Sequence, residues 1–163
     1  MNEAALCAGT YDPITLGHLD VMERAARIFP RVVIAVAPSV GKNPLFEIEE
    51  RVELVKACTA HLSGVEVEVF DGLLVDFARK KSVHVMVRGL RAFSDFEYEF
   101  QMALMNRRLN REVQTVFLMT GLRWIYTSSS IIKQAAQFGG SIKGMVPPLV
   151  EKKIREKYRK ISE

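Results

Sequence analysis

The chain has 163 residues, of which 48% are hydrophobic and 26% charged, and these fractions are typical of an ordinary globular protein of one domain. The sequence contains no apolar run near the ~18 residues that a bilayer span requires, and its start, MNEAALCAG, lacks the basic flank of a secretory signal. We therefore expect a cytoplasmic protein with a single domain over residues 1–163 and no membrane contact. Cys7 and Cys58 form no CxxC motif, so we expect neither a disulfide nor a zinc site.

The formal net charge of +4 is spread unevenly along the chain. Residues 151–163 hold six basic and three acidic side chains, which leaves 17 basic and 16 acidic side chains in the rest. We interpret residues 151–163 as a basic C-terminal helix that docks by one edge, with Ile154 and Tyr158 on that edge, and is otherwise solvated. Because the remainder of the chain is nearly neutral, we expect no nucleic-acid partner.

Apolar residues recur with a period that switches repeatedly between that of a strand and that of a helix, which is typical of alternating βα units. The segment RVVIAVA, for example, is a continuous run of the kind found in strands buried on both faces. Strands are expected at residues 4–8, 31–37, 65–70, 83–87 and 113–119, and helices at 17–29, 47–61, 73–81, 94–109, from the serines at 128–130, and beyond Pro147-Pro148. We therefore predict an α/β fold, a single Rossmann-like domain in which a five-stranded parallel sheet carries helices on both faces.

Sheets of this kind bind ligands in the crevice at the carboxyl ends of their strands, so the loops after the strands are where a site is expected. Four of these loops, GTYDPITLG, PSVGKNPLF, RGLRAFSD and TGLRWIYTSSS, contain groups suited to phosphate. The candidate side chains are Thr10, His18, Lys42, Arg88, Arg91 and the serines at 128–130. Neither GxxxxGK[ST] nor GxGxxG follows a strand, so a nucleotide would have to be held by another arrangement.

His18 follows Gly17 at the point where a helix is expected to begin. Such a helix end presents free N–H groups and the positive end of its dipole, and a glycine lets an anion approach the backbone closely. His18 in the first turn can add a directed donor to the same anion. A histidine at a helix start is often an ordinary surface group, but this one coincides with the expected crevice. His61 and His84 have no such setting, and we interpret both as structural.

Arg88, Gly89 and Arg91 are expected to form a second anion clamp directly after a buried strand, because forked guanidinium groups suit phosphate oxygens. One of the serines at 128–130 can cap a helix, and three in a row favour an anion-binding role as well. No nucleophile, base and orienting acid stand together in these loops. The pattern therefore favours transfer between phosphates, since a phosphate monoester with a second pKa near ~6 is mostly dianionic at pH 7 and needs no base.

The segments GTYDPITLGH, RGLRAFSDFEYE and YTSSS, with the lysine at 42 and in this order and spacing, resemble the bacterial phosphopantetheine adenylyltransferases. These enzymes belong to the nucleotidyltransferase superfamily that is marked by a (T/H)xGH segment, and the resemblance extends from the first strand to the Pro-Pro pair. It implies a reaction of ATP with 4′-phosphopantetheine that gives dephospho-coenzyme A and pyrophosphate, with Mg²⁺, in coenzyme A biosynthesis. It also implies a homohexamer for which coenzyme A is a feedback ligand, but it identifies no magnesium ligands.

The same resemblance implies roles for individual residues. His18 would stabilise the five-coordinate transition state at the α-phosphorus, with Lys42 and Arg91 as further catalytic groups. The phosphopantetheine site would consist of Thr10, Lys42, Leu74 and Arg88. The ATP site would consist of Thr10, Tyr11, His18, Gly89, Leu90, Arg91, Glu99, Trp124, Ile125, Tyr126, Thr127, Ser128, Ser129 and Ser130. The family commonly has an aromatic residue and a proline where Cys7 and Ala8 stand here, a departure that concerns the packing behind the site.

The helix expected at 94–109 carries two apolar stripes, one of them Phe96, Phe100 and Leu104, and the other Tyr98, Met102, Met105 and Leu109. One stripe is expected to face the sheet, and the second needs another cover, either within the same subunit or from a neighbouring subunit.

Three other functions compete with adenylyl transfer to phosphopantetheine. One of them, a nucleic-acid-binding module, is disfavoured by the nearly neutral charge of residues 1–150. A related nucleotidyltransferase could use another phosphorylated acceptor, such as nicotinamide mononucleotide. A sensor that only binds a nucleotide or coenzyme A would need no group at the reacting phosphorus, so the set of His18, Lys42 and Arg91 speaks against it.

Overall fold

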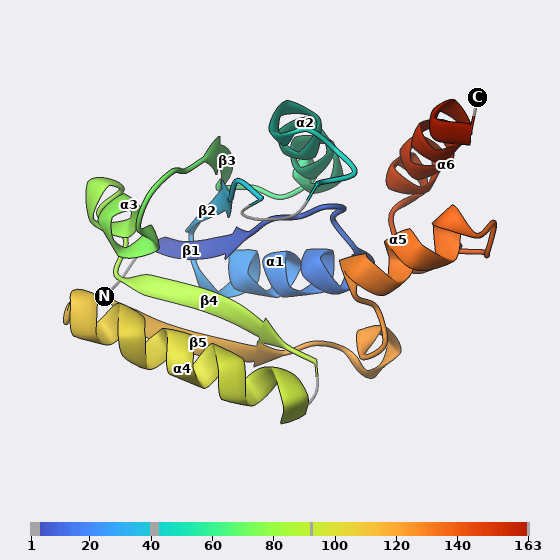
Figure 1. Cartoon of the computed structure of the whole chain (residues 1–163). Coiled ribbons are helices and arrows are strands. Elements are labelled where there is room, and N and C mark those ends of the chain that lie inside the picture. The colour runs from blue at the N-terminus through green and yellow to red at the C-terminus, as the bar shows by residue number, and fades with distance from the viewer. Residues whose placement is uncertain (1–3, 40–42, 92, 163) are drawn as a thin grey trace.

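The computed structural model describes residues 4–39, 43–91 and 93–162. Helices and strands alternate along the chain (Figure 1). The strands are β1 Ala4–Gly9, β2 Arg31–Val36, β3 Val65–Val69, β4 Val85–Leu90 and β5 Gln114–Met119. The helices are α1 Leu16–Ile28, α2 Ile48–Thr59, α3 Leu74–Lys80, α4 Phe93–Leu109, the 3₁₀ turn η1 Leu122–Trp124, α5 Ser129–Gln137 and α6 Pro148–Ser162.

The described strands form one sheet with the order β3-β2-β1-β4-β5, and every neighbouring pair is parallel. This confirms the predicted five-stranded parallel sheet. The chain builds outward from β1 to β3 and then returns to the other side of β1 to add β4 and β5. The strand order therefore reverses between β1 and β4, and a crevice is expected where the loops leaving these two strands diverge.

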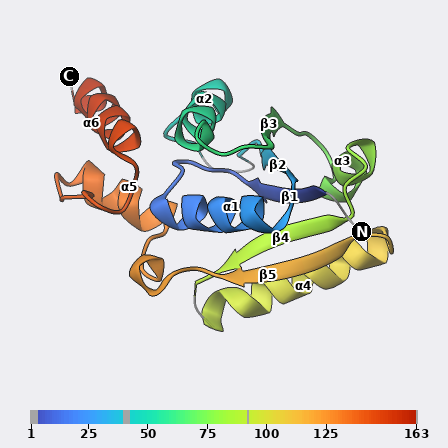
Figure 2. The ribbon, with the colours of Figure 1, turned by 180° about the vertical axis from the view of Figure 1, so that it is seen from behind.

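Helices cover both faces of the sheet, as predicted. α1 and α2 pack on one face over a core that includes Cys7, Ile34 and Val87, whereas α3 packs on the other face over Leu6 and Met86. Figure 1 shows α3 and α4 on the near face, and the reverse view in Figure 2 brings α1 and α2 forward. Val32 to Val36 of β2 are fully buried, which accounts for the unbroken run of apolar residues in that strand.

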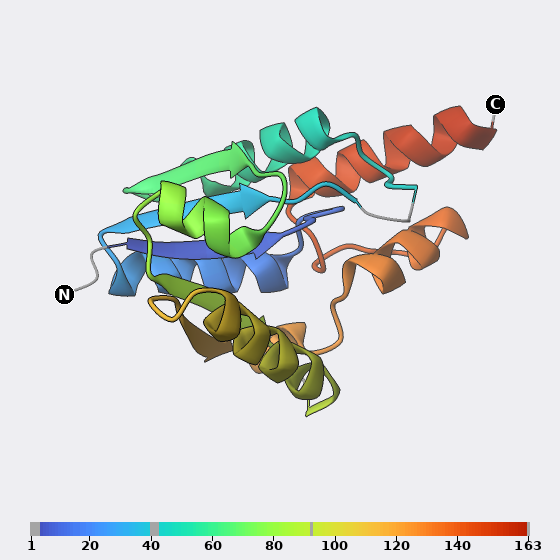
Figure 3. The same ribbon diagram turned by 60° about the vertical axis from the view of Figure 1, so that its left-hand side comes forward.

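The helices α5 and α6 lie beyond the carboxyl ends of the strands (Figures 1 and 3). The basic helix begins at Pro148, before the predicted residue 151, and docks by one edge through Val150 and Ile154, which are fully buried. Its docking edge is therefore part of the core, while most of its basic residues stay exposed.

Each strand differs from its predicted range at one end or both, by one to three residues, and two of these differences concern candidate site residues. β4 continues to Leu90 because it stays paired with β5 as far as Leu90 and Met119, so Arg88 and Gly89 belong to the strand and not to the loop after it. β1 ends at Gly9, one residue beyond the predicted end, so Thr10 and Tyr11 lie in the loop, as the segment GTYDPITLG led us to expect.

The prediction that an apolar stripe of α4 faces the sheet is confirmed only at Phe96, whose ring packs against Phe117 of β5 with centroids 6.2 Å apart. The half-buried positions of the helix are Glu99, Ala103 and Asn106, and the first and last of these find partners on the sheet, in Arg88 and Met86. The helix is thus turned with a polar edge inward. Both apolar stripes are exposed: Phe96, Tyr98, Phe100, Met102, Leu104, Met105 and Leu109.

Both cysteines are free, as expected. Cys7 is buried in β1, and burial raises the pKa of its thiol to about 12, so it behaves as a small apolar side chain. Among the described residues no helix is long and apolar enough to cross a membrane.

Candidate active site

The start of α1 is organised by a reciprocal pair of hydrogen bonds between Thr15 and His18. Thr15 is the N-cap, and its hydroxyl oxygen accepts the backbone N–H of His18 at 3.2 Å. In return, the backbone N–H of Thr15 donates to Nδ1 of His18 at 3.1 Å. This is a capping box in which histidine stands where glutamate or glutamine is usual. The segment TLGH therefore starts the helix and orients the imidazole with the same two residues.

The capping box also assigns the tautomer of His18. Because Nδ1 accepts a hydrogen bond, the proton of the neutral ring is on Nε2. Burial, and then the charges of Arg91 and Arg88, lower the pKa of His18 to about 4. At neutral pH the side chain is thus an uncharged imidazole whose Nε2–H is not used by the capping box.

Tyr11 supports the imidazole from the side. Its ring packs edge-on against His18, with centroids 5.2 Å apart and planes at 88°, and its buried hydroxyl donates to the carbonyl of Cys7 at 3.1 Å. A Cβ at Gly9 would come within 3.0 Å of the Tyr11 ring, so glycine makes room for it. Tyr11 also has a positive φ of 47°, a conformation that is costly for a bulky residue and that the surrounding packing maintains.

Arg88 and Glu99 form a bidentate ion pair, with distances of 2.7 Å from Nε to Oε2 and 2.6 Å from Nη2 to Oε1. Burial opposes the charge on Arg88, but the hydrogen bonds and the charge of Glu99 outweigh it and raise the pKa of the guanidinium. Arg88 also donates to the carbonyl of Ala8. A residue predicted for phosphopantetheine and one predicted for ATP are therefore in direct contact.

Leu74 lies at the start of α3 and packs on the same face of the sheet as Met86. Because side chains alternate along a strand, Arg88 shares that face with Met86. Leu74 and Arg88, both predicted to bind the acceptor, thus lie on the face that α3 and α4 cover.

The segment from Gly121 to Thr127 closes over the start of α1. The N–H of Gly121 donates to Asp20 at 3.1 Å, and Arg91 donates through Nη1 to the carbonyl of Thr127 at 3.1 Å. A Cβ at Gly17 would lie 3.2 Å from Oγ1 of Thr127 and 3.3 Å from Cβ of Trp124. Glycine at this position therefore permits the close approach of the two segments, in addition to any role with an anion.

Three of the other residues predicted to bind ATP differ in exposure, and a fourth, Leu90, lies at the end of β4. Leu90 is buried and accepts hydrogen bonds from Thr120. Trp124 and Ile125 are half-buried, whereas Tyr126 is 85% exposed.

The serines at 128–130 have three different settings. Ser128 caps α5 by accepting the N–H of Ile131 at 3.2 Å, and Ser129 donates to the carbonyl of Pro13 at 2.8 Å. Ser130 is exposed. One hydroxyl thus caps α5, one fastens α5 to the loop after β1, and one remains at the surface.

Lys42 lies outside the described residues. Thr10 directly follows β1 and is exposed, and its carbonyl accepts a hydrogen bond from Arg51. His61 and His84 lie near Glu23 and Glu112 on the surface, in keeping with the structural interpretation.

Comparison with known proteins identifies the family. A model of the cytidylyltransferase-like family matches residues 6–135. The phosphopantetheine adenylyltransferase of Desulfatibacillum aliphaticivorans is 56% identical over 159 residues, which cover 98% of this chain and 91% of that protein. The chain belongs to the phosphopantetheine adenylyltransferase family. The member from Syntrophus aciditrophicus is 51% identical, with 97% of this chain and 96% of that protein covered.

A solved structure from Vibrio parahaemolyticus has the same fold as this family member. That protein has been assigned as a nicotinate-nucleotide adenylyltransferase. The TM-score is 0.70, the two sequences are 18% identical, and the match covers 98% of this chain and 96% of that one. At this identity the likeness concerns the fold alone.

Sequence reasoning missed three charged residues that the structure brings to the loop after β1. Asp12 and Arg51 are buried, and Lys133 of α5 forms an ion pair with Asp12. The sequence does not indicate their role. Asp12-Pro13 is typical of a turn, and Arg51 stands among acidic residues, a pattern typical of a solvent-exposed helix face. Only the three-dimensional arrangement reveals that they meet at the predicted crevice.

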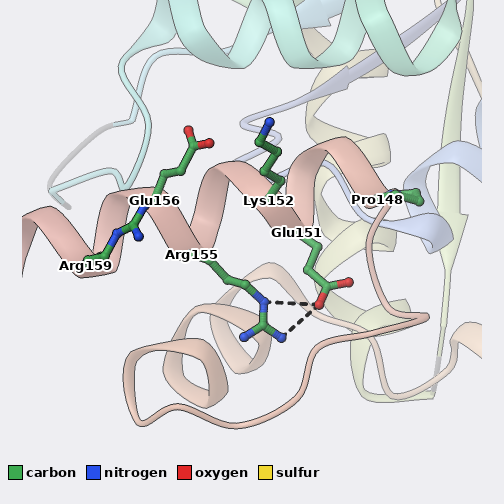
Figure 4. A pocket seen from close by; sticks show the side chains of 6 residues that line it. All are labelled: Pro148, Glu151, Lys152, Arg155, Glu156 and Arg159. Carbon is green, nitrogen blue, oxygen red and sulfur yellow. Dashed lines mark hydrogen bonds and ion pairs between the residues drawn. The ribbon is translucent and has the colours of Figure 1, made fainter.

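A hollow of about 490 Å³ runs along α6 and is drawn in Figure 4. All of its lining residues belong to this helix, and Arg155 already donates to Glu151 at 2.9 Å from Nη2. None of the predicted site residues lines it, so it is separate from the candidate active site.

Proposed function

We propose that the protein transfers the adenylyl group of ATP to 4′-phosphopantetheine and releases dephospho-coenzyme A and pyrophosphate, in coenzyme A biosynthesis. The observation that carries this proposal is the neutral His18, held by Thr15 at the start of α1 with Arg88 and Arg91 close enough to lower its pKa. Family membership supports the choice of substrates, because curated relatives at 51–56% identity carry the name phosphopantetheine adenylyltransferase.

In this reaction an oxygen of the phosphopantetheine phosphate attacks the α-phosphorus of ATP, and the bond from that phosphorus to the bridging oxygen of the β-phosphate breaks. The phosphate is already dianionic near neutral pH, so no general base is needed. Charge builds on the non-bridging oxygens of the five-coordinate phosphorus. The Nε2–H of His18 and the guanidinium of Arg91 would donate to these oxygens, which stabilises the transition state more than the bound substrate.

The proposed acceptor site comprises Thr10, Lys42, Leu74 and Arg88. The shared face of Leu74 and Arg88 supports an acceptor on the side of the sheet that carries α3. Thr10, in the loop directly after β1, would bind the attacking phosphate together with Lys42.

The proposed ATP site adjoins the acceptor site, since Glu99 of the ATP site contacts Arg88 of the acceptor site. Arg91 would bind the triphosphate, and the free N–H groups at the start of α5 suit its phosphate oxygens. Its residues are Thr10, Tyr11, His18, Gly89, Leu90, Arg91, Glu99, Trp124, Ile125, Tyr126, Thr127, Ser128, Ser129 and Ser130.

We propose Mg²⁺ as the metal of the reaction, where it would neutralise charge on the transferred phosphates. Among the described residues no group of three or more His, Cys, Asp or Glu is placed to hold a metal ion. The donors of the described residues therefore do not make a complete magnesium site, and the ion would fit better as part of the MgATP substrate, bound by phosphate oxygens and water.

We also propose that the protein is a homohexamer with coenzyme A as a feedback ligand of the acceptor site. The exposed apolar residues of α4 support association, because a face with Phe96, Phe100 and Leu104 open to water is typical of a subunit contact. The use of ATP as a substrate supports a cytoplasmic location.

The test is pyrophosphate release from MgATP with each of two acceptors. Release is expected with 4′-phosphopantetheine and not with nicotinamide mononucleotide. Release with the nicotinamide acceptor alone would overturn the proposal, and tight binding of ATP without release in either mixture would indicate a sensor.

A further inference from the structure

Helix α1 carries His18 in its first turn, and further along it two charged side chains reach the segment that follows β5. Asp20 accepts the N–H of Gly121 at 3.1 Å through Oδ2. Arg24, four residues later on the helix, lies 3.8 Å from the same oxygen and donates to the carbonyl of Met119. One charged pair on α1 thus holds both a backbone donor and a backbone acceptor of the same short segment.

The contacts of Asp20 and Arg24 lie where the segment 121–127 begins. Thr120, between their two partners, is buried and donates to the carbonyl of Leu90 through its N–H at 2.9 Å and its hydroxyl at 3.1 Å. The carbonyl of Gly121 then accepts the N–H of Trp124 at 2.8 Å, which closes the 3₁₀ turn η1. The turn that bears Trp124 is therefore built directly on the peptide that Asp20 holds.

The same segment packs tightly against the first turn of α1. A Cβ at Gly17 would lie 3.3 Å from Cβ of Trp124 and 3.2 Å from Oγ1 of Thr127. Thr127 in turn donates to the carbonyl of Trp124, through its N–H at 3.0 Å and its hydroxyl at 2.7 Å. Close packing at Gly17 keeps the segment from moving nearer to α1, and the bonds from Asp20 and Arg24 keep it from moving away.

We propose that Asp20 and Arg24 are positioning residues for ATP. They hold the segment 121–127 at a fixed distance from the helix that carries His18, and so align the nucleotide with the group that stabilises the transition state. The inference rests on the proposed function, in which residues 124–127 bind ATP and the acceptor site takes no residue from this segment.

A purely structural role predicts a different result. Loss of a partly exposed hydrogen bond would then lower stability and affect the binding of both substrates alike. A positioning role weakens ATP binding selectively, because residues of the proposed acceptor site are held by other elements. Arg88 is held by Glu99 of α4, and Leu74 packs at the start of α3 on the opposite face of the sheet from α1.

The experiment compares the parent protein with Asp20→Ala, Asp20→Asn and Glu23→Ala, by calorimetric titration with MgATP alone and with 4′-phosphopantetheine alone. Glu23 is a matched control, because it is a carboxylate of the same helix with similar side-chain exposure, 34% against 26% for Asp20. It also has a basic partner, but this is His61 at 3.1 Å, which belongs to neither proposed site.

We expect Asp20→Ala to raise the dissociation constant of MgATP at least about tenfold, and that of phosphopantetheine less than about threefold. Asp20→Asn keeps an oxygen that can accept the N–H of Gly121, so it should recover part of the affinity for ATP. Glu23→Ala should leave both dissociation constants near those of the parent.

Trp124 provides a second measurement, because it is the only tryptophan of the chain. Quenching of its fluorescence by acrylamide, without substrates, should be stronger in Asp20→Ala than in the parent or Glu23→Ala. Arg24→Met, which removes the donor to the carbonyl of Met119, should shift quenching and ATP affinity in the same direction, and it serves if Asp20→Ala does not fold.

Equal weakening of both substrates, or unchanged affinity for MgATP in folded Asp20→Ala or Arg24→Met, would overturn the inference. The proposed function can fail separately. A parent protein that binds both substrates and releases no pyrophosphate would refute adenylyl transfer while the binding comparison still decides the role of Asp20. A parent protein that binds no MgATP would overturn both.

Discussion

His18 is expected to act as a neutral hydrogen-bond donor, and raising the pH from 7.5 to 9.5 tests this. Its Nδ1 accepts the N–H of Thr15, and burial together with Arg91 and Arg88 lowers its pKa to about 4. The imidazole of the free enzyme is therefore uncharged across the whole window. Its contribution to kcat/KM for ATP, which reports the free enzyme, should not change.

Catalysis by a protonated His18 would instead give a strong dependence of activity on pH. If catalysis required an imidazolium with the ordinary pKa of about 6.5, the active fraction would fall about tenfold per pH unit, or about 100-fold between pH 7.5 and 9.5. The lowered pKa also affects stability. The unfolded chain binds a proton at His18 near pH 6.5 and the folded chain does not, so stability is complete above pH 6.5 and falls as the pH drops toward 4. A shift from 6.5 to about 4 corresponds to a loss of at most about 3 kcal/mol.

The assay is pyrophosphate release at several pH values by the parent protein, His18→Gln and His18→Ala. The glutamine amide can place a neutral N–H near the position of Nε2 and does not titrate, so it isolates the contribution of the imidazole. We expect flat and similar profiles for the parent and His18→Gln, and turnover at least about 100-fold lower for His18→Ala, with ATP affinity within about tenfold. A tenfold decline per pH unit in the parent beside a flat His18→Gln profile would refute the neutral donor.

Three further outcomes are expected. Gly89→Ala would place a Cβ 2.8 Å from Cγ2 of Val21, so it should lower the free energy of unfolding in urea by about 1–3 kcal/mol, and Val21→Ala should restore part of it. Ile154→Ala should cost about 2–5 kcal/mol because the side chain is fully buried, whereas Lys152→Ala on the exposed side should change little; equal effects would contradict the docking of α6. Phe100→Asp should reduce the mass measured by sedimentation if the exposed face of α4 is a subunit contact, and an unchanged mass would exclude Phe100 from it.

Much of the fold could be predicted from the sequence, because the spacing of apolar residues along a helix or strand reflects which of its faces is buried. The run RVVIAVA predicts a strand covered on both faces, and β2 is such a strand. The start of α1 was predicted to within one residue, since Gly17 and His18 indicate a close approach and a donor at a helix start, whereas the capping role of Thr15 emerges only from the structure. The end of β4 was not, because Arg88 and Gly89 have the composition of a loop while their pairing with β5 depends on another part of the chain.

The candidate site was predictable where one residue acts through its own type and position. It was not predictable where charges separated in sequence meet, as Asp12 does with Lys133. The same limit explains the orientation of α4. Its apolar residues favour an inward stripe, but the ion pair of Arg88 with Glu99 brings a polar edge to the sheet.

In the proposed hexamer, the two sides of α4 would link catalysis to the concentration of the protein in solution. Glu99 on the inner side holds Arg88, and the outer side exposes Phe96 and Phe100. Where a neighbouring copy covers the outer side, it also stiffens the helix that carries Glu99. Dilution to the point where copies separate should therefore lower the specific activity per chain, which makes enzyme concentration a variable to be controlled in every kinetic comparison.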